Sequence, residues 1–449
     1  MTRGPALAAL FLLVSSAAAA GQGPAPPAAD PLAAEAKKRH AALVQDGFNM
    51  TYGWTFESAG EKKPLRLEFL VPDAEGEHRV SFWMESREGE AGVALRGPDG
   101  TPILAWSGRR GEAAFSRALP AGKYVLEIDR AHAAGGHALL GVKGPLIHRC
   151  EVSAERVSEE PAAPEKGFFW PYLLYVPKEP RAGSLLVAPN NTGFARDDLE
   201  LIRAASSCEV RRQAALAERL GAPLLVPLFP RPKVAGEDDN LYLHALTRAA
   251  LTAEAPALRR VDLQLLAMAD DARTVLAAKG VAVDAKLLLR GFSASGSFVN
   301  RFAVLHPGRV LAVACGSPGG WPLAPVAKAG GETLPYPVGT ADLPALTGRR
   351  LDARALKGVA WFFFLGEKDA NDAVVFRDSF SKADEALVFR LFGATPVARW
   401  KKAEDLYAKA GLDARFALYP GVGHEVTPEI EADVAKFFEG ALAARAASR

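Results

Sequence analysis

The pattern of apolar and polar residues divides the chain near residue 150. Before that point, short stretches such as Leu65 to Phe69 and Arg79 to Trp83 alternate apolar and polar residues, with Gly- and Pro-containing turns between them. Strict alternation is typical of strands that bury one face, and several short strands at this spacing indicate two packed antiparallel sheets. We therefore predict a β-sandwich accessory domain over residues 47–150. A flexible leader and a short helix are expected before it, over residues 21–46.

From residue 167 to the end, apolar strands alternate with amphipathic helices. This alternation is typical of a mostly parallel sheet with helices on both faces. The charged, Pro- and Ala-rich residues 151–166 are interpreted as a linker, which leaves residues 167–449 as an α/β domain. Strands are expected at residues 168–176, 184–188, 223–228, 287–289, 310–315, 359–365 and 415–419, and helices at residues 196–220, 261–279, 400–410 and from 428 onward.

The first 20 residues have the pattern of a signal peptide. Arg3 gives the positive end, residues 6–14 form an apolar stretch, and three alanines end at Ala20 before Gly21. The apolar stretch is too short to span a bilayer, and no later stretch reaches membrane length. We therefore expect cleavage near Ala20 and export to the periplasm or beyond, with no membrane span.

Composition narrows the classes of function. The chain has 449 residues, of which 49% are hydrophobic and 24% charged, values typical of a soluble globular protein with two domains. A formal net charge of +2 argues against nucleic acid or a strongly charged membrane surface as the main partner. An oxidising compartment permits one disulfide among the three cysteines. Cys150 with Cys208 is the expected pair, because Cys315 lies in an apolar run and is interpreted as a buried free thiol.

One stretch, residues 286–296, carries the chemistry. Its sequence, KLLLRGFSASG, places a buried apolar strand before a turn bounded by Gly291 and Gly296, and helical spacing follows the turn. A strand, a tight turn and a helix are the context in which a G-x-S-x-G-type motif exposes a nucleophilic serine. Ser293 is therefore the candidate nucleophile. The alternative is a structural turn that happens to contain serines, and Ser295 stands where the motif usually has glycine.

A serine nucleophile needs a base and a carboxylate that orients the base. Asp369 follows the apolar strand at residues 361–365 and is the candidate acid, with Asp372 in the same loop as the alternative. His424 follows the last strand in a Gly-rich loop and is the candidate base. The chain order Ser293, Asp369, His424 is the order used by α/β-hydrolases.

Residues 167–449 therefore resemble an α/β-hydrolase, similar to secreted bacterial esterases of the polyhydroxyalkanoate-depolymerase and feruloyl-esterase type. The resemblance implies an eight-stranded, mostly parallel sheet and a serine mechanism that uses neither a cofactor nor a metal. It also implies an oxyanion hole of two backbone N–H groups, one from Ala294 and one from Asn191. Pro189 and Asn190 replace the His-Gly pair that the family often shows, so the choice between the two asparagines stays open.

Further candidates lie where strands of the sheet end, since ligands of open α/β sheets bind beyond the carboxyl ends of the strands. The Pro- and Gly-rich residues 318–356 are expected to form a lid or a pocket rim. The candidate pocket residues are Asn190, Phe229, Arg231, Tyr242, His244 and Trp321.

The leading hypothesis is a secreted serine hydrolase that cleaves carboxylic esters, small or polymeric, through an acyl-enzyme. A serine peptidase on the same fold is the first alternative, because esters and amides use the same machinery. A non-catalytic exported binding protein is the second. The sequence makes no prediction of oligomeric state.

Overall fold

The computed structural model of the chain describes residues 31–46, 50–56, 64–71, 77–144, 147–150, 155–181, 183–191, 199–232, 241–376 and 379–448. The expected signal peptide, the leader up to residue 30 and the first four residues of the expected linker lie outside these ranges. The chain forms two compact units, residues 1–150 and 151–449.

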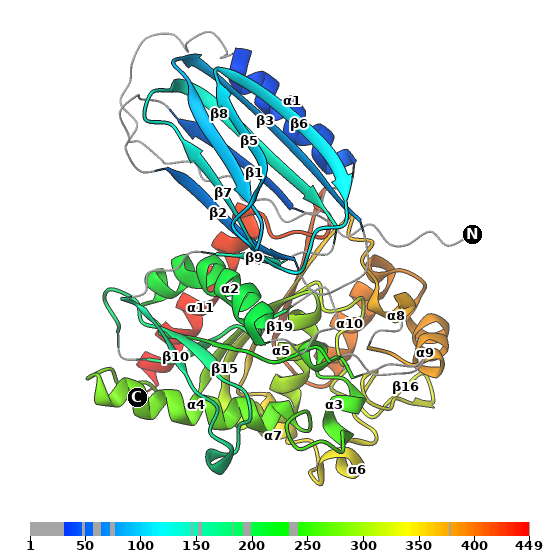
Figure 1. The fold of residues 1–449 in the computed structure, drawn as a ribbon. Helices are drawn as coiled ribbons and strands as arrows, with labels where there is room; N and C mark the ends of the chain where they lie inside the picture. Colours follow the sequence, from blue (N-terminus) through cyan, green and yellow to red (C-terminus); the bar gives the residue numbers. More distant parts are fainter. Residues whose placement is uncertain are drawn as a thin grey trace, which may run out of the picture. The chain divides into compact units, whose positions relative to one another are not determined.

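The first unit contains the helix α1 (Pro31–Gln45) and two antiparallel sheets, drawn in blue to cyan in Figure 1. Along β2, buried positions alternate with more exposed ones, as the sequence pattern requires for a strand with one buried face. Phe69 of β2 and Phe82 of β3 belong to one hydrophobic cluster to which both sheets contribute. The four-stranded sheet has the order β1 (Met50–Phe56), β8 (Ala134–Lys143), β3 (His78–Glu88) and β6 (Arg110–Arg117). The five-stranded sheet has the order β5 (Pro102–Gly108), β4 (Ala91–Arg96), β7 (Gly122–Asp129), β2 (Leu65–Val71) and β9 (Ile147–Arg149).

The second unit is built on one eight-stranded sheet. The strand β11 is antiparallel to both of its neighbours, and all other adjacent strands are parallel. The eight-stranded, mostly parallel sheet implied by the resemblance is therefore confirmed. Its strands, in spatial order, are β10 (Val157–Glu160), β11 (Tyr172–Tyr175), β13 (Leu224–Pro227), β12 (Leu186–Val187), β14 (Leu287–Phe292), β15 (Val310–Gly316), β18 (Ala360–Gly366) and β19 (Ala414–Tyr419).

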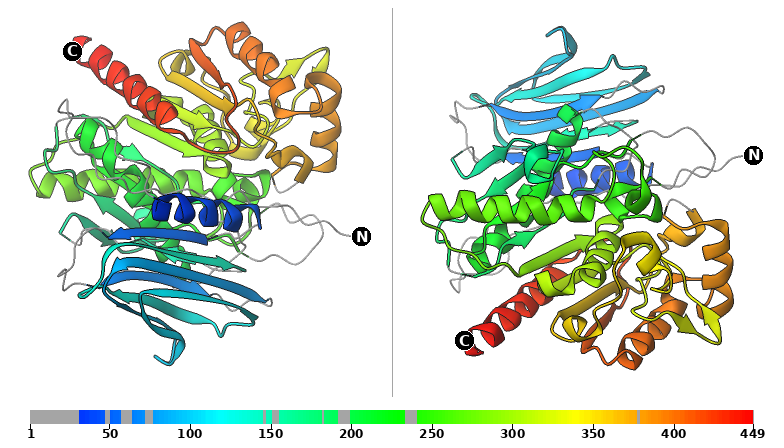
Figure 2. Two further views of the ribbon diagram at one scale, coloured as in Figure 1. Left: turned by 90° about the horizontal axis from the view of Figure 1, so that it is seen from above. Right: turned by 90° about the horizontal axis from the view of Figure 1, so that it is seen from below.

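Helices cover both faces of this sheet (Figures 1 and 2). The helices α2 (Leu199–Leu220) and α11 (Pro428–Ala447) share one hydrophobic cluster with inward-facing strand residues such as Leu288. A second cluster joins Leu287 and Leu289 to the other face, which α4 (Val261–Ala278), α5 (Ala294–Leu305) and α10 (Pro396–Lys409) cover. Because neighbouring side chains of a strand point to opposite faces, the apolar run at residues 287–289 feeds both cores, as expected for a buried parallel strand.

The interpretation of residues 151–166 as a linker is wrong for residues 155–166, the part of this stretch that the structure describes. The edge strand β10 lies within it and pairs with β11 alone. Two of the four residues of β10 are glutamates, and an edge strand tolerates such polarity because one side of it stays in water. Its sequence, VSEE, does not alternate apolar and polar residues, so the pattern could not predict a strand here.

Residues 318–356 are not a structureless loop. They contain a small antiparallel pair and two short helices. Trp321 and Leu334 belong to a fourth hydrophobic cluster, whereas Leu343 and Leu356 of the two helices pack in the cluster that also contains Leu287. The elements of this segment are β16 (Lys328–Ala329), β17 (Glu332–Thr333), α6 (Leu343–Thr347) and α7 (Ala353–Leu356). The second unit also contains α3 (Arg248–Thr252), α8 (Ala373–Phe376), α9 (Lys382–Phe392) and the 3₁₀ turns η1 (Pro164–Lys166), η2 (Leu243–Ala245) and η3 (Pro307–Arg309).

Both Cys150 and Cys208 are disulfide-bonded, and Cys315 is a buried free thiol, as expected from the sequence. Burial raises the pKa of the Cys315 thiol well above its ordinary value, which keeps it unreactive. Within the ranges given above, no helix has the length and apolar character needed to cross a membrane.

Candidate active site

Ser293 lies on a strained turn between the end of β14 and the start of α5. Its backbone has φ 61° and ψ −126°, a conformation that L-residues rarely adopt and that surrounding structure must enforce. A Cβ atom on Gly291 would lie 2.1 Å from the Ser295 carbonyl oxygen, and one on Gly296 would lie 2.3 Å from that of Gly316. Only glycine fits at either position. The turn therefore has the close backbone approach on which the prediction of a nucleophile depended.

The serine in the usual glycine position of the motif has a structural role. The Ser295 hydroxyl accepts a hydrogen bond from the backbone N–H of Phe292 at 3.0 Å and lies 2.9 Å from the carbonyl oxygen of the same residue. These contacts close the turn across its base. The departure from the common motif therefore leaves the position of Ser293 intact.

His424 and Asp369 meet at the same end of the sheet. His424 lies in the loop between β19 and α11, and its Nδ1 is 3.0 and 2.9 Å from the two carboxylate oxygens of Asp369. The Asp369 side chain is fully buried, whereas 17% of the His424 side chain is exposed. Burial alone would raise the pKa of Asp369. Hydrogen bonds from His424, the Ser317 hydroxyl and the backbone N–H of Asn371, with the charge of His424, outweigh burial and hold this pKa below its ordinary value.

Asn371 is a residue of this site that the sequence did not reveal. Its backbone N–H donates to Asp369 Oδ1 at 2.9 Å. Its side-chain Nδ2 lies 2.9 Å from His424 Nε2 and 3.4 Å from Ser293 Oγ. Among the hydrogen bonds of the described residues, none joins Ser293 Oγ to His424 directly; the Asn371 amide lies between them. The only sequence signal is its place between two aspartates in a loop after a buried strand.

The alternative acid, Asp372, points elsewhere. Its carboxylate lies 2.9 Å from Nη1 of Arg399, and both side chains are buried. It also accepts a hydrogen bond from the backbone N–H of Val374. The contact with His424 is therefore made by Asp369 and not by Asp372.

The two candidate asparagines differ in their surroundings. Asn190 is buried, and its side-chain amide pairs with both the N–H and the carbonyl oxygen of Phe229. Asn191 is exposed, and its Oδ1 accepts a hydrogen bond from the Tyr242 hydroxyl at 3.1 Å. Ala294 is the first residue of α5, so its N–H belongs to the helix turn whose donors have no partner within the helix.

Of the candidate pocket residues, Arg231 and Tyr242 lie together beside Asn191, whereas others are fully buried. The guanidinium of Arg231 lies 3.7 Å from the ring centroid of Tyr242, which forms a cation–π pair next to Asn191. Phe229 and His244 are fully buried, and burial lowers the pKa of His244 to about 4, so it is neutral at pH 7. The ring of Trp321 is also fully buried and stacks on Phe392, with centroids 4.0 Å apart. Phe229, His244 and Trp321 are therefore core residues, and the expectation that they line a pocket open to solvent is wrong.

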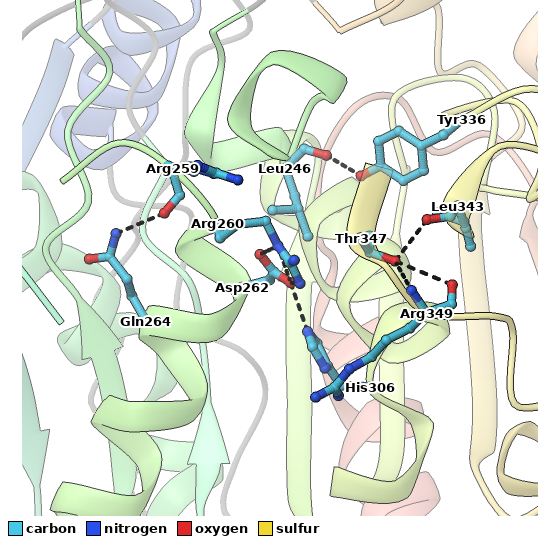
Figure 3. Close-up of polar contacts among 10 residues, drawn as sticks. All are labelled: Leu246, Arg259, Arg260, Asp262, Gln264, His306, Tyr336, Leu343, Thr347 and Arg349. Atoms are coloured by element: carbon cyan, nitrogen blue, oxygen red, sulfur yellow. Dashed lines mark hydrogen bonds and ion pairs between the residues drawn. The ribbon is translucent and has the colours of Figure 1, made fainter. Parts of the chain in front are cut away.

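Another His–Asp pair, which is buried, lies at the C-terminal end of α5, the helix that follows Ser293 (Figure 3). His306 follows α5, and its Nε2 lies 2.8 Å from Oδ2 of Asp262, to which Arg260 also donates at 2.8 Å. Burial opposes ionisation of Asp262, but hydrogen bonds and charge from His306 and Arg260 outweigh it and lower the pKa. Its position at the opposite end of α5 from Ser293 makes this pair a structural clamp.

The chain was compared with known protein families, curated sequences and solved structures. No protein-family model matches the sequence, and no curated protein matches it. The structure is similar to a poly(aspartic acid) hydrolase-1 from Sphingomonas sp. KT-1, at 16% identity over 61% of this chain and 92% of that one, with a TM-score of 0.39. It is also similar to a poly(3-hydroxybutyrate) depolymerase from Bordetella parapertussis, at 21% identity over 60% and 86%, with a TM-score of 0.39. A third is an S-formylglutathione hydrolase from Agrobacterium tumefaciens, at 14% identity over 64% and 93%, with a TM-score of 0.37. At these scores the argument for function depends on the residues of the site.

Proposed function

We propose that the protein is a serine hydrolase that cleaves carboxylic esters through an acyl-enzyme. The observation that supports this most strongly is the hydrogen bond between His424 Nδ1 and the buried Asp369 carboxylate, beside a serine on a strained strand-to-helix turn. A base oriented by an ionised acid and placed near a serine hydroxyl is the arrangement that acyl transfer requires.

In this mechanism, His424 Nε2 takes the Ser293 hydroxyl proton as Oγ attacks the ester carbonyl carbon. The bond from that carbon to the alkoxy oxygen then breaks, and the imidazolium returns the proton to the departing oxygen, which leaves as an alcohol. Water then attacks the carbonyl carbon of the acyl-enzyme while His424 takes its proton. The bond from that carbon to Ser293 Oγ breaks, the imidazolium returns the proton to Oγ, and the carboxylic acid leaves. Asp369 holds the Nδ1–H tautomer and stabilises the imidazolium in both halves.

The oxyanion of each tetrahedral intermediate needs two donors. We assign them to the backbone N–H groups of Ala294 and Asn191. The position of Ala294 at the start of α5 supports the first assignment. The exposure of Asn191, in contrast to the burial of Asn190, supports the second assignment.

Two measurements and one control variant test the proposal. Hydrolysis of short p-nitrophenyl esters is expected to exceed hydrolysis of matched peptide anilides, and the reverse preference would make the protein a peptidase. A fluorophosphonate probe is expected to label Ser293, identified by peptide mass spectrometry. Absence of labelling together with absence of ester hydrolysis would favour a binding protein. The Ser293→Ala variant is the control in each assay.

We also propose export and an accessory role for the first unit. The pattern of residues 1–20 supports cleavage near Ala20, and the disulfide-bonded state of Cys150 and Cys208 is what an oxidising compartment permits. The shared hydrophobic cluster of the two N-terminal sheets supports a β-sandwich. Mass spectrometry of the mature N-terminus tests export, and a start at Met1 would contradict it.

A further inference from the structure

We propose that Asn371 is a positioning residue that keeps the catalytic base occupied until an ester enters. This inference rests on the proposed function and concerns the regulation of the same site. The observation behind it is that the Asn371 side-chain nitrogen, and not Ser293 Oγ, is the hydrogen-bond partner of His424 Nε2 at 2.9 Å.

The direction of that hydrogen bond follows from the other side of the ring. Asp369 is held ionised and receives the Nδ1–H of His424, so Nε2 carries the lone pair of the neutral imidazole. The Asn371 amide must therefore donate to Nε2. A base whose lone pair already accepts a hydrogen bond cannot take the serine proton at the same time.

The second amide hydrogen has a partner as well. Asn371 Nδ2 lies 3.4 Å from Ser293 Oγ, so the amide lies between the two groups that must exchange a proton. The alkoxy oxygen of an ester has to reach this same region, because it receives its proton from His424 Nε2. Substrate and the Asn371 amide therefore compete for one position.

The backbone of Asn371 is fixed while its side chain has room to move. Its N–H is bonded to Asp369 Oδ1 at 2.9 Å, and the residue is only partly buried, in contrast to Asp369 and Asp372 on either side. Rotation of one short side chain is therefore enough to free His424. The free protein then has a less reactive serine than the complex with an ester.

Two variants separate this role from simple packing. Asn371→Ala removes the donor, so kcat/KM for p-nitrophenyl acetate on the pH plateau is expected to rise about fivefold, the value of one neutral hydrogen bond. Asn371→Leu keeps a similar volume but also lacks the donor, so it is expected to raise the plateau kcat/KM as Asn371→Ala does. A residue that only fills space would leave Asn371→Leu at the wild-type value, which would overturn the proposal.

Imidazole ¹⁵N spectroscopy tests the contact independently of activity. In a Ser293→Ala background, adding Asn371→Ala is expected to move the Nε2 resonance of His424 toward that of an acceptor without a hydrogen bond. An unchanged resonance, or a plateau kcat/KM that falls tenfold or more in Asn371→Ala, would overturn the proposal. The exposed neighbour Ala370 provides the matched control, and Ala370→Ser is expected to change neither the resonance nor the plateau kcat/KM. Full activity of Ser293→Ala would instead overturn the proposed nucleophile and leave the spectroscopic result standing.

Discussion

The carboxylate of Asp372 lies 2.9 Å from Nη1 of Arg399, and this buried ion pair separates its role from that of Asp369. Arg399 Nη1 also donates to the Gly320 carbonyl, and its Nε donates to the Gly393 carbonyl. The pair therefore ties the acid loop to two other segments, whereas Asp369 contacts the base. Two aspartates of one loop thus have different partners, His424 for Asp369 and Arg399 for Asp372.

Asparagine substitutions at Asp369 and Asp372 are expected to affect different properties, turnover at the first position and stability at the second. Asp369→Asn should lower kcat by roughly four orders of magnitude, because the base loses its orienting charge. Asp372→Asn should keep most activity per folded molecule but lower the free energy of unfolding by about 3 kcal/mol, because the Arg399 charge stays buried without its carboxylate. Ester turnover and urea denaturation of the two variants measure both quantities. The reverse ranking in turnover would transfer the role of acid to Asp372.

Ser293→Ala is expected to lower kcat by about six orders of magnitude without unfolding the protein. The hydroxyl is the attacking group, while the turn is held by contacts that do not need it, such as the hydrogen bond from Ser293 N–H to the Gly316 carbonyl. Circular dichroism and ester turnover check the two parts. If the variant keeps measurable turnover at normal fold, Ser293 is not the nucleophile and Ser295 becomes the next candidate.

Gly296→Ala is expected to be far more harmful to the fold than Ser293→Ala. The added Cβ would lie 2.3 Å from the Gly316 carbonyl oxygen, which belongs to the central strand β15. Backbone atoms at this distance cannot yield as a flexible side chain would, so we expect insoluble protein or a loss of several kcal/mol. Gly308→Ala is the matched control, since its Cβ would meet no atom within 4 Å. Equal solubility of the two variants would contradict the strained turn.

The parts of the site that could be predicted from sequence are those with a local cause. Ser293 lies between Gly291 and Gly296, where the turn leaves no room for a side chain. His424 lies in a Gly-rich loop after the last apolar strand. The edge strand β10 has no such local signal, because its residues are polar and only its partner makes it a strand. Asn371 acts through side chains 53 and 78 residues away in the chain, so no local pattern could reveal it. The burial of Trp321 likewise depends on a distant ring, that of Phe392.

Removal of the first unit is expected to leave a folded α/β unit, provided that the cut falls before β10 at residue 157. The cut separates Cys208 from Cys150, its expected disulfide partner, so residues 151–449 should carry Cys208→Ser. We expect little loss of turnover on small soluble esters and a larger loss on particulate polyesters if the first unit binds polymer. The full chain with Cys150→Ser and Cys208→Ser controls for the missing disulfide. An insoluble fragment beside a soluble control would mean that the two units share a core.

The last prediction concerns the clamp at the far end of α5. The pKa of Asp262 is lowered in the fold, so its ionisation stabilises the folded state above its ordinary pKa of about 4. That stability is lost as pH falls through the lower folded-state value. The free energy of unfolding should therefore fall between about pH 5 and pH 2 in the wild type and fall less steeply in Asp262→Asn. Urea denaturation across this range measures both slopes. Because Asp262 contacts His306 and Arg260 and not the residues of the site, Asp262→Asn is also expected to keep the shape of the activity–pH profile above pH 5. Equal unfolding slopes in the two proteins would show that the clamp does not depend on the charge of Asp262.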